Sequence, residues 1–153
     1  MNNIYDESAL EEIIARIDQL SPHSTPRWGK MNAAQMLAHC SVFQSIAMGE
    51  LSPARGWLGK LIGKLVSPAF YNDKPLQKNM STIPEMMIVT ESVFEHEKAT
   101  LKQKLRIFQS NGPERCTAHP HPFFGTLTPE QWGKGIYKHL DHHLQQFGVP
   151  SRR

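Results

Sequence analysis

Segment 128–147 constrains the fold most, because it carries a full set of helix start and stop signals. Thr128 is a good N-cap, Pro129 suits the first helical position, and Gln131 can close a capping box. Gly148 follows where a helix would end. Apolar residues recur at helical spacing between these signals, at Trp132, Ile136, Leu140 and Phe147. The segment is therefore predicted to be a long amphipathic helix with one buried face.

Three earlier segments show the same periodicity and are predicted to be long helices over residues 7–20, 32–48 and 91–110. Their expected N-caps are Asp6 or Ser8 (with Glu11 closing a capping box), Asn32, and Thr90. In the third, the buried stripe is expected at Phe94, Leu101, Leu105 and Phe108. No alternating run of strand length competes, so the prediction is an all-α four-helix bundle, a single domain over residues 1–153.

Residues 57–66 are predicted to form an extra, short amphipathic helix between the second and third long helices. Its apolar residues are Trp57, Leu58, Leu61, Ile62, Leu65 and Val66, while Lys60 and Lys64 fall on the other face. The favoured interpretation is a lid whose apolar side packs over the bundle. The alternative is a membrane-surface protein, since a basic polar face suits anionic lipid.

Composition narrows the class of protein. The chain has 153 residues, of which 39% are hydrophobic and 20% charged, as in a soluble globular domain. The net charge of +3 is spread along the chain, so no nucleic-acid partner is predicted. No apolar run approaches the ~20 residues of a transmembrane helix. Early acidic residues argue against a secretory signal, and Cys40 and Cys116 form no zinc motif or disulfide framework, so a cytoplasmic location is expected.

Histidines are the most unusual part of the composition, with eight in the chain. His139 and His143 are four residues apart, which places both rings on one helical face inside or beside the apolar stripe. Two such rings can bind one transition-metal ion. The competing interpretation is a pair of hydrogen-bonded core histidines. His142 falls on the flank, and His39, in the second predicted helix, is the third candidate ligand.

The remaining candidates are weaker. His23, His96 and His119 are predicted to lie at the surface, and Cys40 is predicted to be a small buried residue rather than a nucleophile. His121 lies in the His-Pro-His-Pro loop that leads into the last helix. We expect this loop to line the mouth of the site, with His121 as a substrate contact and not a metal ligand. That placement requires the loop to fold back along the bundle.

Two blocks of sequence resemble the DinB-like (YfiT-like) superfamily. In the first, Trp28 precedes a short polar stretch and then Gln35-x-x-x-His39; in the second, His139-x-x-x-His143 is followed by Leu-Gln-Gln-Phe. The block 121–149 is similar to an uncharacterised bacterial subgroup of that superfamily, a domain of unknown function. The resemblance covers roughly residues 5–149.

The resemblance implies an up-up-down-down bundle in which His39, His139 and His143 hold a divalent metal. Nickel or zinc is the expected ion, with manganese as a further candidate. It also implies a homodimer. Members of the superfamily include thiol-dependent transferases and hydrolases. A small-molecule substrate, with a low-molecular-weight thiol as cosubstrate, is the corresponding expectation.

Three neutral imidazoles would leave a bound metal its full charge and an open position, as in catalytic sites. Such an ion can activate a water for hydrolysis or a thiol for transfer. Asp141, Glu95 and Glu97 are the carboxylates nearest in sequence, and no catalytic residue is assigned. The favoured hypothesis is a metal-dependent S-transferase or hydrolase, and the alternative is a non-enzymatic metal-binding or stress-associated bundle.

Overall fold

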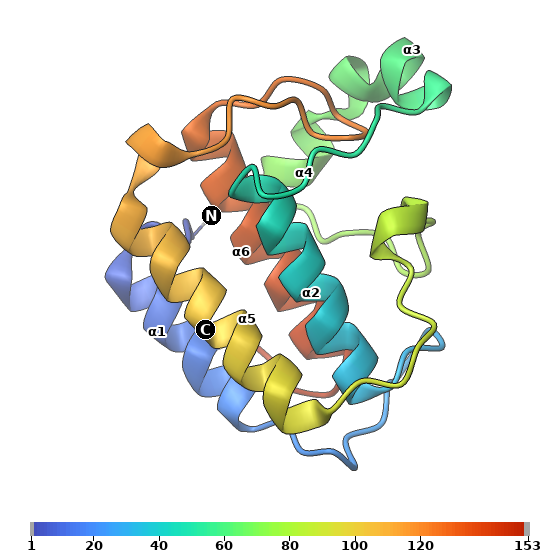
Figure 1. The fold of residues 1–153 in the computed structure, drawn as a ribbon, viewed down its shortest axis with the longest axis vertical. Coiled ribbons are helices and arrows are strands. Elements are labelled where there is room, and N and C mark those ends of the chain that lie inside the picture. Colours follow the sequence, from blue (N-terminus) through green and yellow to red (C-terminus); the bar gives the residue numbers. More distant parts are fainter. Residues whose placement is uncertain (1, 152–153) are drawn as a thin grey trace.

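Four long helices pack side by side in the computed structural model, which describes residues 2–151 (Figure 1). They are α1 (Glu7–Asp18), α2 (Ala33–Ala47), α5 (Phe94–Asn111) and α6 (Pro129–Gln146). The shorter elements are α3 (Trp57–Val66), α4 (Pro68–Tyr71) and the 3-10 helices η1 (Pro84–Met86) and η2 (Pro113–Arg115). Within residues 2–151 the only β-type pairing is an isolated bridge between His121 and Gly125. The predicted all-α bundle is confirmed, including the extra helix 57–66; α4 was not expected.

The order of helix directions differs from the expected up-up-down-down. Glu12 contacts Tyr137, and one turn further along both helices Arg16 contacts Asp141, so α1 and α6 run in the same direction. Helices α2 and α5 run the opposite way (Figure 1). Connection 19–32 turns the chain back at one end, and connection 48–93 returns along the whole bundle before α5 begins. The result is up-down-down-up, and the expected connectivity is wrong.

Two of the predicted N-terminal caps are present with both hydrogen bonds of a capping box. Asn32 and Gln35 exchange them at the start of α2, and Thr128 and Gln131 do so at the start of α6. These boxes fix where both helices begin, and therefore the axial positions of the histidines that they carry.

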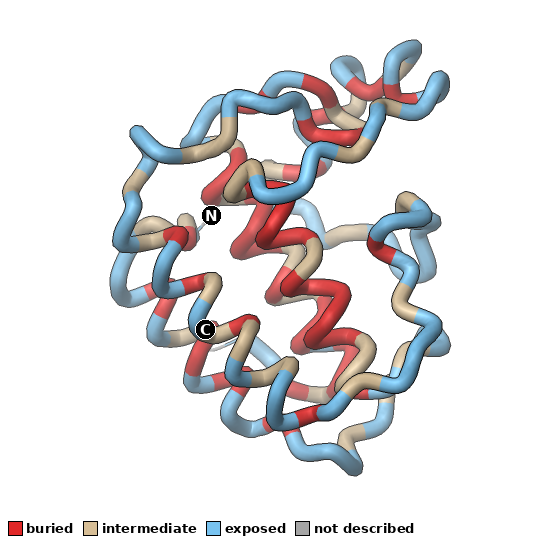
Figure 2. Tube along the Cα trace, in the orientation of Figure 1, coloured by how far each residue is buried: buried red, intermediate tan, exposed pale blue. Residues whose placement is uncertain are grey.

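The other two predicted starts need correction. Asp6 is the N-cap of α1 but makes no side-chain cap bond, and no Ser8–Glu11 box forms. Helix α5 begins at Phe94 after extended Val93, so Thr90 is not its cap. The expected stripe of α5 is nevertheless buried as predicted, at Phe94, Leu101, Leu105 and Phe108. Figure 2 shows buried positions gathered on the inward faces of the long helices.

Helix α3 stands at the edge of the molecule and does not act as the expected lid (Figures 1 and 2). Trp57, Leu61 and Leu65 are 76%, 73% and 82% exposed. The buried residues of the helix are instead Gly59 and Gly63. The prediction that its apolar side covers the bundle is therefore wrong. Among residues 2–151 no helix combines the length and apolar character needed to cross a bilayer.

Candidate metal centre

The three predicted ligands, His39 of α2 and His139 and His143 of α6, come together where α2 and α6 pack against each other. Each offers one ring nitrogen, and these three atoms all lie within 4.8 Å of one another. His39 and His143 are buried, while His139 is partly exposed. The i, i+4 spacing places the α6 pair on one face, and the antiparallel packing of α2 brings His39 to it. No other group of this kind is found among residues 2–151.

Two of the three rings are oriented by a partner on Nδ1. The Nδ1 of His39 lies 2.9 Å from the Met86 carbonyl oxygen, and the Nδ1 of His143 lies 2.8 Å from Oε1 of Gln146. A carbonyl oxygen only accepts, so Nδ1 carries the proton in both rings and Nε2 keeps its lone pair. Such outer partners are typical of metal-binding histidines, because they fix the tautomer and the ring orientation.

His139 is held differently. Its Nδ1 is buried and has no hydrogen-bond partner in the described part of the chain. Its ring packs instead against Phe43, with ring centroids 4.4 Å apart. Its Nε2 lies 3.2 Å from Nε2 of His39, and because that nitrogen of His39 carries no proton, His139 is the donor when no metal is bound. Packing, rather than an outer hydrogen bond, sets the orientation of this ring.

One nitrogen–nitrogen distance in the cluster fits a divalent transition metal. Two nitrogens bound at 2.0–2.1 Å in a tetrahedral zinc site lie about 3.3 Å apart. The 3.2 Å between the Nε2 atoms of His39 and His139 is close to that value. All the donors are imidazole nitrogens, which suit zinc and nickel better than calcium or magnesium.

The environment keeps the three rings neutral. Burial lowers the pKa of His143 to about 3, and it also lowers the pKa of His39, against the opposing effect of the Met86 carbonyl. The pKa of His139 lies well below its usual value because of burial first and then the neighbouring histidines. Metal ions bind the neutral form of imidazole, so near neutral pH no proton has to leave before a metal binds.

His121 is buried rather than exposed at the surface of its loop. Its Nδ1 accepts hydrogen bonds from the backbone N–H groups of Phe123 and Phe124, and the ring lies 5.3 Å from that of Trp132. The loop therefore does fold back on the start of α6. Phe43 contacts both His121 and His139, at centroid distances of 5.9 and 4.4 Å. The Phe43 ring therefore links His121 to the nearest metal-ligand candidate. Its contact with a substrate stays a prediction.

The other candidates lie outside the cluster. His23, His96 and His119 are exposed, as predicted, and His142 is half-buried on the flank. Cys40 is buried with its thiol against Met36, and burial raises the pKa of that thiol, which disfavours a nucleophilic thiolate. Glu95 lines a surface pocket between α1 and α5, and neither Glu95 nor Glu97 belongs to the three-histidine group.

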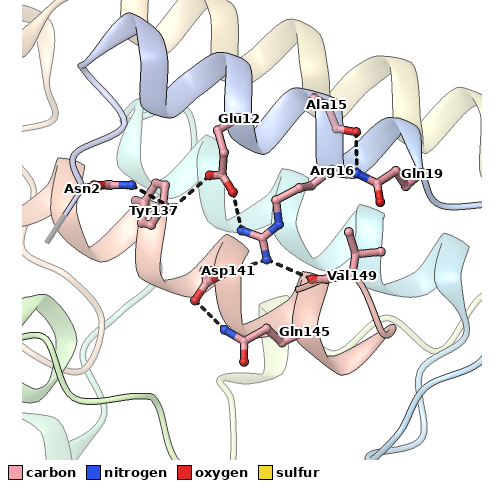
Figure 3. Close-up of polar contacts among 9 residues, drawn as sticks. All are labelled: Asn2, Glu12, Ala15, Arg16, Gln19, Tyr137, Asp141, Gln145 and Val149. Carbon is pink, nitrogen blue, oxygen red and sulfur yellow. Dashed lines mark hydrogen bonds and ion pairs between the residues drawn. The ribbon is translucent and has the colours of Figure 1, made fainter. Parts of the chain in front are cut away.

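Asp141 belongs to a separate polar cluster between α1 and α6 (Figure 3). Arg16, whose side chain is 1% exposed, pairs with Asp141 at 2.8 Å and with Glu12 at 3.1 Å, and donates to the Val149 carbonyl. Tyr137 donates to Glu12 from the same side. At about 100° per residue, Tyr137 and Asp141 lie opposite the histidine pair on α6. We therefore assign this carboxylate a structural ion pair.

Sequence reasoning missed the two groups that orient the ligand rings. Gln146 was detectable in principle, because it follows His143 by three residues and a helix brings such side chains together. The Met86 carbonyl was not, because a backbone group in a loop leaves no signature in residue type.

No curated protein and no solved structure matches this chain. One family profile does, over residues 4–150, which is nearly the whole chain. The histidine cluster and the bundle that holds it both lie within that range. The chain belongs to DUF1569, a family described as proteins of unknown function.

Proposed function

We propose that this protein is a metal-dependent enzyme of small-molecule chemistry, an S-transferase or a hydrolase. One divalent ion, nickel or zinc, would be bound by His39, His139 and His143. The observation that carries the proposal is the convergence of three neutral ring nitrogens, two of them on rings held through Nδ1. A hydrogen bond between His39 and His139 accounts for two of these nitrogens, but it does not require the third, from His143, to lie beside them.

The donor set favours catalysis over a closed structural site. Structural zinc sites usually have four protein ligands, whereas three ligands leave room for water or substrate. Three neutral ligands also leave the ion its full positive charge, which lowers the pKa of a bound water or thiol. A bound thiolate would serve transfer to an electrophile, and a bound hydroxide would serve hydrolysis.

A surface pocket at Trp28, lined by none of the three histidines but linked to His143 through Gln146, supports a small-molecule substrate. Its volume is about 280 Å³, and its lining includes Trp28, Arg27 and Lys78. The Trp28 ring lies 5.5 Å from that of His142, and its carbonyl accepts a hydrogen bond from Gln146, the partner of His143. The two cations would favour a substrate with an anionic group.

The position of the histidines on the second and last long helices also supports our proposal of a DinB-like relationship.

The test compares metal-loaded and chelated protein in a screen for turnover. Untagged protein is loaded with nickel, zinc or manganese and offered low-molecular-weight thiols with electrophiles, and separately esters. We expect turnover only in a loaded form, and its loss in His139→Ala but not in the half-buried neighbour variant His142→Gln. Turnover that survives both chelation and His139→Ala would contradict the proposal. Stoichiometric metal without turnover would favour the non-enzymatic alternative.

A further inference from the structure

Helix α3 presents an apolar stripe to the outside of the molecule. Trp57, Leu61 and Leu65 fall within about 80° of one another around the helix and are all more than two-thirds exposed. Leu58 continues the stripe and is 43% exposed. Scattered exposed apolar residues are ordinary, but a row of large ones on one helix face marks an interaction surface.

The opposite side of α3 fixes this orientation. A Cβ at Gly63 would collide with the Phe123 carbonyl oxygen, and one at Gly59 would lie 2.8 Å from the same atom. Arg55 donates to the Gly59 carbonyl at 2.6 Å and to the Phe123 carbonyl at 3.4 Å. The glycine side is thus pressed against loop 121–125, so the apolar stripe cannot turn inward without breaking these contacts.

The charged residues of segment 51–72 all have one sign. Lys60 and Lys64 are exposed and flank it on the side next to Trp57. Between Glu50 and Asp73 the chain has no acidic residue, and Arg55 adds a third cation. Lysine side chains can lie along an apolar boundary and keep their ammonium groups in the polar layer.

We propose that the outer face of α3 binds the surface of an anionic phospholipid membrane. Trp57, Leu61 and Leu65 would enter the boundary between headgroups and acyl chains, and Lys60 and Lys64 would contact the anionic headgroups. Tryptophan is favoured at that depth, and apolar insertion combined with basic charge is what interfacial helices use. This binding is independent of the metal centre.

Charge separates a lipid surface from a second copy of this chain. Two copies packed through this face would bring the lysines of both helices together. No acidic residue on segment 51–72 is available to neutralise them. Like charges across an interface disfavour that pairing, whereas an anionic membrane complements it.

Co-sedimentation with vesicles tests the proposal, with a chelator present so that metal plays no part. Vesicles of phosphatidylglycerol and phosphatidylcholine in equal parts should retain the protein and shift its tryptophan emission to the blue, while pure phosphatidylcholine should not. Of the tryptophans at 28, 57 and 132, Trp57 is the exposed one and Trp132 is fully buried. The Lys64→Gln variant should lower the partition coefficient about five-fold.

The matched controls distinguish binding through α3 from binding caused by positive charge or apolar surface elsewhere on the protein. The Trp57→Ser/Leu61→Ser/Leu65→Ser variant should lose vesicle binding. A Met80→Ser/Met87→Ser/Val89→Ser variant, which also replaces three exposed apolar residues, should keep it, as should Lys30→Gln. Vesicle binding that survives the α3 triple substitution, or its absence in the parent, would overturn the proposal. So would a dimer that only the α3 triple substitution dissociates, since a second copy would then cover this face.

Discussion

The two sides of α6 carry polar clusters of different kinds: one is held by ion pairs, and the other consists of neutral histidines. Toward α1, the Arg16 guanidinium is paired with two carboxylates and a carbonyl (Figure 3). Toward α2, three neutral rings meet with one nitrogen of each within 4.8 Å of the others and no countercharge among them. The first arrangement pairs its buried positive charge with carboxylates of the protein itself. The second brings together ring nitrogens that can each offer a lone pair and holds no countercharge, which suits a site for an external cation.

This difference separates a polar cluster that joins helices from one prepared to bind a ligand. A buried charge has to be compensated, because its desolvation is costly. A buried neutral imidazole has a smaller desolvation penalty, so the histidine cluster can stay folded without a metal.

The largest expected effect is on stability, from Arg16→Met. This variant leaves the carboxylates of Glu12 and Asp141 without their buried partner, and loss of one member of a buried ion pair typically costs about 3–5 kcal/mol. Urea unfolding measured by circular dichroism gives the free energy of unfolding. The control is Arg106→Met, which breaks an exposed pair with Glu11 and should cost about 0–1 kcal/mol. Equal costs for the two variants would remove the structural role that we assign to the Arg16 cluster.

The next effect is on metal affinity, from Gln146→Leu. The amide of Gln146 joins the His143 ring to the Trp28 carbonyl, so its loss frees the orientation of that ring. Removal of such an outer partner typically lowers metal affinity about 10–100-fold. Calorimetric titration with zinc measures the change. Its neighbour Gln145, which donates to Asp141 on the other side, is the matched control, and Gln145→Leu should bind zinc like the parent. A Gln146→Leu variant that matches the parent would show that packing alone orients His143.

The smallest effect is a change of pH dependence from His121→Asn. Burial lowers the pKa of His121 to about 3, with a further contribution from Arg55, whereas an unfolded histidine titrates near about 6.5. Between these values the unfolded chain binds the extra proton. The stability that this group contributes is therefore complete above about pH 6.5 and is lost as pH falls toward 3.

Asparagine can keep an acceptor for the N–H groups of Phe123 and Phe124 without titrating. The variant should therefore lose stability less steeply on acidification than the parent, by at most about 1.4 kcal/mol per pH unit. Chemical unfolding of the metal-free protein at pH 7 and pH 5 gives the two slopes. Identical slopes would mean that His121 is protonated without unfolding.

Sequence was most informative where local chemistry determines structure. The capping boxes at Asn32 and Thr128 set the starts of α2 and α6, and helical periodicity then placed His139 and His143 on one face. Thr90 shows the limit of such signals. A good capping residue does not by itself start a helix. Residues 91–93 follow Thr90 but lie outside α5, which begins at Phe94.

Tertiary contacts decided the rest. Periodicity correctly made 57–66 an amphipathic helix, but it could not say which side faces the protein. Close approach to the Phe123 backbone favoured the side with Gly59 and Gly63, and the apolar stripe was left outside. The Met86 carbonyl and the pairing of Arg16 with Asp141 depend on long-range packing, which no local pattern records.

The most direct test of the metal centre is a measurement of metal stoichiometry on untagged protein. The parent, loaded with zinc or nickel and dialysed, should retain one ion per chain by elemental analysis. His39→Ala, His139→Ala and His143→Ala should each retain far less while remaining folded by circular dichroism, and His142→Ala should match the parent. One ion per chain in all three ligand variants, or none in the parent, would contradict the three-histidine centre.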